Sequence, residues 1–108
     1  MNLTNGILNV SLTLSMEFGE NWLKPINQRL KEKYLNLNHE ELEEYNNICK
    51  KVNKEAHNFI FNNPVKYKNK VELIDFTKFE NYTKKKYEWI SNNNMRRLYS
   101  QSCYYATK

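Results

Sequence analysis

Residues 37–64 read LNHEELEEYNNICKKVNKEAHNFIFNNP, and they predict a long amphipathic helix. Their apolar positions recur at alternating steps of three and four residues, which is the spacing of one face of an α-helix. This face contains Leu42, Tyr45, Cys49, Val52, Ala56 and Phe59. Ile48 and Ile60 widen it. A residue before a proline is disfavoured in the α region, so the helix is expected to end before Pro64.

The residues at the start of this helix form a capping pattern that recurs twice later in the chain. Asn38 stands at the N-cap with Glu41 three residues later, in the positions of a capping box. Leu37 and Leu42 stand where a hydrophobic staple would form. The same cap and staple occur at Asp75, with Ile74 and Phe79, and at Ser91, with Ile90 and Met95. The sequence therefore predicts three helix N-termini.

The N-terminal segment is apolar on most of its helical sides. One face contains Ile7, Val10, Leu14 and Phe18, and much of the rest is covered by Leu8, Leu12 and Met16. Such a helix is expected at the centre of a fold. Pro25 then breaks or kinks the chain. A shorter helix follows, with one face formed by Trp22, Ile26, Leu30 and Tyr34.

The composition agrees with an all-α fold, because the 108 residues include only two glycines and two prolines, too few for many tight turns. We predict one domain over residues 1–108, a compact bundle of four to five helices. The expected helices are 4–20, 22–35, 39–61, 76–90 and 92–106. Residues 62–74 are the expected long loop, in which residues 65–68 alternate weakly in the manner of an extended segment.

The net charge of +5 is unevenly spread, since residues 64–108 alone carry +6. This excess fits an ordinary lysine-rich helical surface, and the alternative is a surface for an anionic partner such as a nucleic acid, an acidic protein or a membrane surface. Polar residues interrupt the apolar run of residues 7–18, so it does not resemble a signal peptide, and a membrane span needs about 20 apolar residues. We expect a cytoplasmic protein in which Cys49 and Cys103 are reduced thiols.

No grouping of residues indicates catalysis or a metal site. Cys49 and His57 are separated by about 12 Å along a helix axis. Cys49 lies in the middle of the apolar face and is expected in the core, whereas His57 lies outside it, beside Lys50 and Asn46. Cys103 has no histidine near it in the sequence, and glycine-rich phosphate loops are absent. The sequence therefore predicts a protein that is not an enzyme and has no metal or cofactor.

The two C-terminal helices each show two faces. In helix 92–106 the expected core face is Met95, Leu98, Tyr99, Ser102 and Ala106, flanked by Cys103 and Tyr105 and opposed by Arg97, Gln101 and Tyr104. We expect this core face to pack chiefly against the N-terminal helix. In helix 76–90 the expected core face is Phe76, Phe79, Thr83, Tyr87 and Ile90. A second stripe, Lys78, Tyr82, Lys85 and Trp89, is either a second buried face or an exposed strip that binds a partner.

Three segments, SMEFGENWLKPINQRL (15–30), LEEYNNIC (42–49) and WISNNNMRRLYSQSCYYA (89–106), resemble a family of small all-helical proteins from low-GC bacteria of the Bacteroidetes type. The resemblance spans most of the chain. It implies a helical fold and no particular activity, so it assigns a role to no residue.

Two functions fit these patterns. The first is a non-catalytic interaction module that binds a protein partner or itself, with Tyr82, Lys85, Trp89, Arg97, Gln101 and Tyr104 as partner-binding residues. The alternative is nucleic-acid binding, with Asn92, Asn93, Asn94, Arg96 and Arg97 entering a groove. Against this alternative, the junction between Ile90 and Ser91 leaves little room for the usual turn. Glu80 and Glu88 also interrupt the positive charge.

Overall fold

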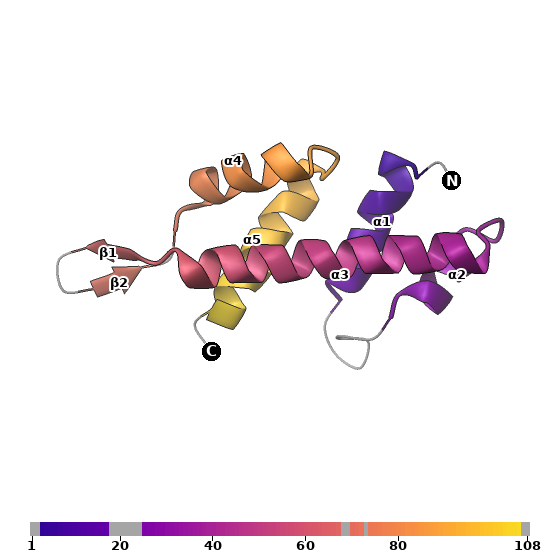
Figure 1. Ribbon diagram of the computed structural model, residues 1–108, viewed down its shortest axis with the longest axis horizontal. Coiled ribbons are helices and arrows are strands. Elements are labelled where there is room, and N and C mark those ends of the chain that lie inside the picture. The colour runs from indigo at the N-terminus through magenta and orange to yellow at the C-terminus, as the bar shows by residue number, and fades with distance from the viewer. Residues whose placement is uncertain (1–2, 18–24, 68–69, 73, 107–108) are drawn as a thin grey trace. The chain divides into compact units, whose positions relative to one another are not determined.

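The computed structural model describes residues 3–17, 25–67, 70–72 and 74–106. These residues form five helices and one two-stranded hairpin (Figure 1). In chain order the elements are α1 (Asn5–Ser15), α2 (Asn27–Lys33), α3 (His39–Asn62), β1 (Val65–Tyr67), β2 (Lys70–Glu72), α4 (Phe76–Lys86) and α5 (Asn92–Ala106). The predicted all-α class and the number of helices are confirmed.

Contacts within the chain group into two compact units, Met1–Val52 and Asn53–Lys108. The first unit contains α1, α2 and residues 39–52 of α3, and the second contains the rest of α3, the hairpin, α4 and α5. The single domain predicted over residues 1–108 stays a prediction, and so does the contact between residues 92–106 and the N-terminal helix.

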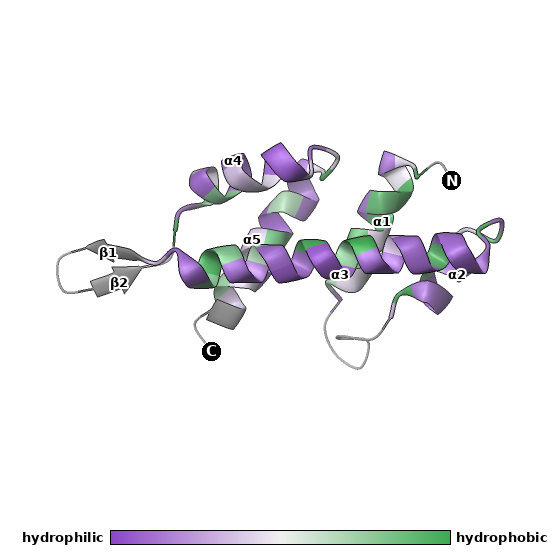
Figure 2. Ribbon diagram, viewed as in Figure 1, coloured by the Kyte–Doolittle hydropathy of each residue, from purple (hydrophilic) through white to green (hydrophobic). Residues whose placement is uncertain are grey.

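In the first unit, α1 is capped by Thr4, whose hydroxyl oxygen accepts a hydrogen bond from the Ile7 amide at 3.2 Å. The Thr4 amide donates to the Tyr45 hydroxyl of α3, also at 3.2 Å. α1 is largely hydrophobic (Figure 2). Its buried residues are Leu8, Ser11, Leu12 and Leu14, and Met16, just after the end of the helix, is also buried. Ile7 and Val10 are only half-buried, and Phe18 and Trp22 lie outside the described residues.

Arg29 of α2 binds the C-terminal end of α1. Its Nη1 atom donates to the Leu14 carbonyl at 2.9 Å and lies 3.3 Å from the Glu17 carboxylate. The last carbonyls of a helix have no partner within the helix, and a cation there also interacts favourably with the helix dipole. α1 ends at Ser15 rather than near residue 20, and Arg29 stabilises this end.

The capping box of α3 is confirmed by two reciprocal hydrogen bonds. The Glu41 amide donates to Asn38 Oδ1 at 2.8 Å, and the Asn38 amide donates to Glu41 Oε1 at 3.0 Å. The helix ends at Asn62, before Pro64, as predicted. Its buried apolar face is Leu42, Tyr45, Cys49, Val52, Ala56 and Ile60, with Ile48 and Phe59 half-buried.

The predicted position of Asn46, on the polar side of α3 beside His57, is wrong. Asn46 is buried, with only 5% of its surface exposed. Its Oδ1 atom accepts a hydrogen bond from the Ile26 amide at 3.2 Å, just before α2. A buried amide is stable when it is hydrogen-bonded in this way, and a hydrophobicity pattern does not reveal it.

The hairpin of the second unit lies within the expected loop. β1 and β2 pair in antiparallel register, Val65 with Glu72 and Tyr67 with Lys70. The extended segment is therefore confirmed for residues 65–67, and residue 68 lies outside the described residues.

α4 begins as predicted, because Asp75 Oδ1 accepts a hydrogen bond from the Lys78 amide at 2.9 Å. It ends at Lys86, four residues before the expected end. Tyr87 leaves the helical conformation, and its hydroxyl donates to Glu55 of α3 at 2.8 Å. Five residues, 87–91, therefore connect α4 to α5, and the predicted crowding at Ile90 and Ser91 is wrong.

α5 begins at its predicted cap, where the Ser91 hydroxyl oxygen accepts a hydrogen bond from the backbone N–H of Asn94 at 3.2 Å. Its buried side chains are Asn94, Met95, Leu98, Gln101 and Ser102, with Tyr99 half-buried. Gln101 was expected to face outward and is only 3% exposed, so this expectation is wrong. At about 100° per residue, the buried face is rotated by about 50° from the expected one. Of Tyr105 and Ala106 only the backbone is described.

Aromatic rings connect the helices of the second unit. Phe79, which is fully buried, lies 6.3 Å from Phe59 and 5.3 Å from Tyr99, measured between ring centres. Phe76 meets the Tyr99 ring edge-on at 5.4 Å. The Tyr99 hydroxyl donates to the Ile74 carbonyl at 2.7 Å. These contacts hold α4 against α5 and against the end of α3.

Candidate interaction surface

Three side chains of the predicted second stripe lie together on the outer side of α4. Lys78, Tyr82 and Lys85 are spaced four and three residues apart, so they project from one side of the helix. All three are exposed, and Tyr82 keeps 36% of its surface accessible. We call these three residues the α4 strip. The stripe is therefore exposed in this part rather than a second core face.

The ring of Tyr82 is held in place by a stacked aromatic neighbour. It stacks on Phe59 of α3 with ring centres 3.9 Å apart and planes inclined by only 6°. Phe59 in turn contacts the buried ring of Phe79. The Lys86 ammonium also lies 5.3 Å from the centre of the Tyr82 ring. Tyr82 is thus an exposed aromatic residue with a fixed orientation, which is a property of residues that anchor protein interfaces.

Glu55 fixes the neighbouring end of α4. One of its carboxylate oxygens lies 3.5 Å from Lys86 Nζ and accepts the 2.8 Å hydrogen bond from Tyr87. The hydrogen bond with Tyr82, together with the Glu55 charge, raises the pKa of Lys86. Burial, together with Glu55, raises the pKa of Tyr87 to about 12. Lys86 therefore already interacts with Glu55 and Tyr82 within the fold.

Lys78 and Lys85 differ from Lys86. Among the side chains that the structure describes, neither has an ion-pair partner. Residues 53–108 contain eleven Lys and Arg residues and five Asp and Glu residues, so the second unit has a net charge of +6, against −1 for the first. The α4 strip thus presents two exposed ammonium groups on the basic unit.

Trp89 does not continue the strip. It lies in the turn after α4, half-buried, with its ring 6.3 Å from that of Tyr87 and nearly perpendicular to it. The prediction placed it on a helical face, and this is wrong because α4 ends at Lys86, where the helical spacing stops.

The remaining predicted site residues lie on α5. Arg97 and Tyr104 are exposed, Tyr104 by 50%, whereas Gln101 between them is buried. The six predicted partner-binding residues therefore separate into four locations. Tyr82 and Lys85 share one surface, Arg97 and Tyr104 lie on α5, Trp89 lies in a turn, and Gln101 lies in the interior.

Two relevant residues were missed in the sequence. Phe59 was assigned only to the core, yet it carries the exposed ring of Tyr82. Phe61 is 69% exposed and lies on the opposite side of α3 from the buried face. Its position in the helical spacing, outside the apolar face, was a signal that could have identified it.

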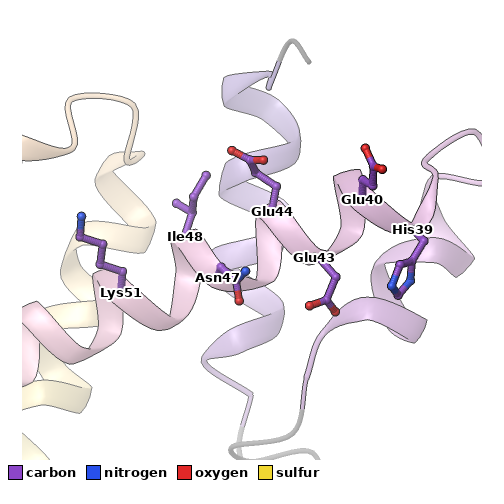
Figure 3. A pocket seen from close by; sticks show the side chains of 7 residues that line it. All are labelled: His39, Glu40, Glu43, Glu44, Asn47, Ile48 and Lys51. Atoms are coloured by element: carbon purple, nitrogen blue, oxygen red, sulfur yellow. The ribbon is translucent and has the colours of Figure 1, made fainter.

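The first part of α3 has an open hollow on its surface, shown in Figure 3. It is lined by His39, Glu40, Glu43, Glu44, Asn47, Ile48 and Lys51. The carboxylates of Glu40 and Glu44 point to one side of the helix and that of Glu43 to the other (Figure 3). Glu43 also accepts a hydrogen bond from the Asn27 amide group. Among the described residues, no group of three or more His, Cys, Asp or Glu side chains could hold a metal ion.

The cysteines and His57 have environments that disfavour their charged forms. Cys49 is 1% exposed, as expected for a core residue, and burial raises its pKa to about 12. Burial lowers the pKa of His57, so its imidazole is neutral near pH 7. Burial also raises the pKa of Cys103, partly offset by a hydrogen bond with Tyr99. A nucleophilic cysteine needs a lowered pKa, so neither thiol is activated in this structure.

Within the described part of the chain, no helix is long and apolar enough to cross a membrane. No known protein family, curated protein or solved structure matches the chain. The resemblance to the helical bacterial family stays a prediction.

Proposed function

We propose that the protein is a non-catalytic interaction module that binds a protein partner, or a second copy of itself, in the cytoplasm. The observation that carries this proposal is the α4 strip, in which the fixed, exposed ring of Tyr82 lies between Lys78 and Lys85. Aromatic residues that lose little conformational freedom on binding are favourable interface anchors. Exposed cations beside them add long-range attraction and orientation.

The α4 strip can be tested without disturbing the fold. Lys78→Ala combined with Lys85→Ala removes two exposed cations and leaves the Tyr82–Phe59 stack intact. Affinity capture from native lysate would be compared for the wild type, this variant and a control, Lys50→Ala with Lys54→Ala. The control removes two exposed lysines from α3. We expect a specific partner that is retained by the wild type and the control and lost by the strip variant.

Binding of that partner would then be repeated with purified proteins. Sedimentation of the wild type alone tests self-association. If every captured protein binds the strip variant as well as the wild type, and the protein is monomeric, the proposal is wrong.

A second candidate, nucleic-acid binding, is favoured by the connection between α4 and α5. Its five residues leave room for the turn of a helix–turn–helix, which usually has three or four residues. Asn92, Asn93, Arg96 and Arg97 are exposed in the first turns of α5, although Asn94 is buried. Arg96 also lies 5.3 Å from the centre of the Phe76 ring, so its guanidinium already has a contact. For this reason nucleic-acid binding remains the second candidate.

The salt dependence of binding distinguishes this candidate. Phosphate contacts make the affinity fall steeply between about 50 and 200 mM salt. Gel shifts with DNA and RNA at low salt, with Arg97→Ala as the variant, would test it. Absence of a shift with both nucleic acids at low salt would exclude this function.

A further inference from the structure

We infer that the α4 strip docks an acidic α-helix of a partner protein, with its carboxylates seven residues apart. This inference rests on the proposed interaction function and specifies the chemistry of the partner. It follows from the charge of the strip, the spacing of its cations and the state of the Tyr82 ring.

The charge of the strip favours an anionic partner. Lys78 and Lys85 are exposed, have no ion-pair partner among the described side chains and belong to a unit of net charge +6. Lys86, by contrast, is already bound to Glu55 and lies over Tyr82. A partner therefore gains attraction chiefly at Lys78 and Lys85.

The spacing of the two lysines matches a helix. Seven residues along α4 correspond to about 10.5 Å at 1.5 Å per residue. Glutamates seven residues apart on a partner helix have the same separation and lie on one face. An apolar residue between these glutamates would face Tyr82, which lies four residues after Lys78 and three before Lys85. An amphipathic helix laid along a helical surface is a common recognition mode.

The Tyr82 ring argues for a protein partner rather than a nucleic acid. Single-stranded nucleic acids bind by stacking bases on open aromatic faces. The Tyr82 ring already stacks on Phe59 at 3.9 Å, and the Lys86 ammonium lies 5.3 Å from its centre. One face of the ring is therefore already covered by Phe59, which leaves less of it for stacking on a base.

The experiment uses the full chain and three labelled probes in fluorescence anisotropy. The first is a helical peptide of about 20 residues, long enough to form a helix in water, with Glu seven apart and Leu four residues after the first Glu of each pair. The second carries Gln in place of these Glu residues. The third is a single-stranded oligonucleotide with the same number of negative charges as the Glu peptide.

The protein variants test the surface. Lys78→Glu with Lys85→Glu reverses the strip, and Lys50→Glu with Lys54→Glu makes the same change in net charge on α3. We expect the Glu peptide to bind at least about tenfold more tightly than the Gln peptide, and the strip reversal to weaken it by about tenfold or more. The α3 control should change binding by less than about threefold.

Four outcomes overturn the inference. Equal binding of the Glu and Gln peptides would show that the strip does not select an acidic partner. Tighter strip-dependent binding of the oligonucleotide would show that the strip binds a nucleic acid instead. Equal weakening by both double variants shows a general charge effect instead of a site. If no peptide binds while a captured protein still depends on Lys78 and Lys85, the interaction function stands and only the inferred chemistry fails.

Discussion

Replacing Tyr82 with alanine tests whether its ring is held as firmly as the stack on Phe59 implies. Tyr82 is 36% exposed, so about two thirds of the roughly 200 Å² of a tyrosine is removed from water. At about 25 cal/mol per Å² this burial contributes at most about 3 kcal/mol. Since alanine retains part of the contact, we expect Tyr82→Ala to lower the free energy of unfolding by about 2–3 kcal/mol.

The control for this prediction is Tyr82→Phe, which keeps the ring and removes only the hydroxyl. It should change stability by less than about 0.5 kcal/mol. Urea unfolding followed by circular dichroism measures both variants. Combining Tyr82→Ala with Phe59→Ala should give a coupling energy of about 1 kcal/mol, the value typical of paired aromatic rings.

A Tyr82→Ala variant as stable as the wild type would refute the reasoning, because the ring would then not be packed on Phe59. A large loss with Tyr82→Phe would also contradict it, since the hydroxyl rather than the ring would hold α4.

Three further predictions concern stability. Arg29→Ala removes the bonds to Leu14 and Glu17 and should cost about 1–3 kcal/mol in urea unfolding; no change would mean that the end of α1 does not depend on this side chain. Asn38→Ala removes the cap of α3 and should cost about 1 kcal/mol, whereas glycine, which also caps helices, should cost only a few tenths. The pKa values of Tyr87 and Tyr99 are raised from 10.0 to about 12, so the unfolded chain loses these protons first, and stability should fall as pH rises from 10 to 12. Tyr87→Phe with Tyr99→Phe should flatten this part of the pH profile, and an unchanged profile would contradict the assignment.

The helix starts were predictable because capping is local. Asn38 bonds to a residue three positions away, and Asp75 and Ser91 do the same. A side chain and an amide within one turn depend on nothing elsewhere in the chain, so the short sequence pattern contains the whole interaction. The end of α3 before Pro64 is local in the same sense.

The end of α4 could not be predicted in this way. The helix stops beside Tyr87, whose hydroxyl reaches Glu55, 32 residues earlier in the chain. Asn46 and Gln101 were misplaced for a related reason, since a hydrophobicity pattern does not show which amides the fold buries. The end of α4 and the burial of Asn46 and Gln101 therefore depend on contacts that the spacing of apolar residues does not reveal.

The candidate surface was predictable in part. The spacing placed Lys78, Tyr82 and Lys85 on one stripe, but the same stripe fitted a buried second face equally well. The structure shows that Lys78, Tyr82 and Lys85 are all exposed, with the ring of Tyr82 stacked on Phe59. The sequence thus identified the residues of the strip and not their environment.

The three consecutive lysines that end α4 have a practical consequence for labelling the protein. Lys84 is half-buried, Lys85 is exposed, and Lys86 is held by Tyr82 and Glu55 with a raised pKa. The uncharged amine is the form that attacks an amine-reactive dye, so the raised pKa of Lys86 should slow its acylation. A dye coupled through exposed lysines would therefore reach Lys85 as well as Lys50 and Lys54, and at Lys85 it would block the surface whose binding it was meant to report. A label attached at a chain terminus avoids this interference.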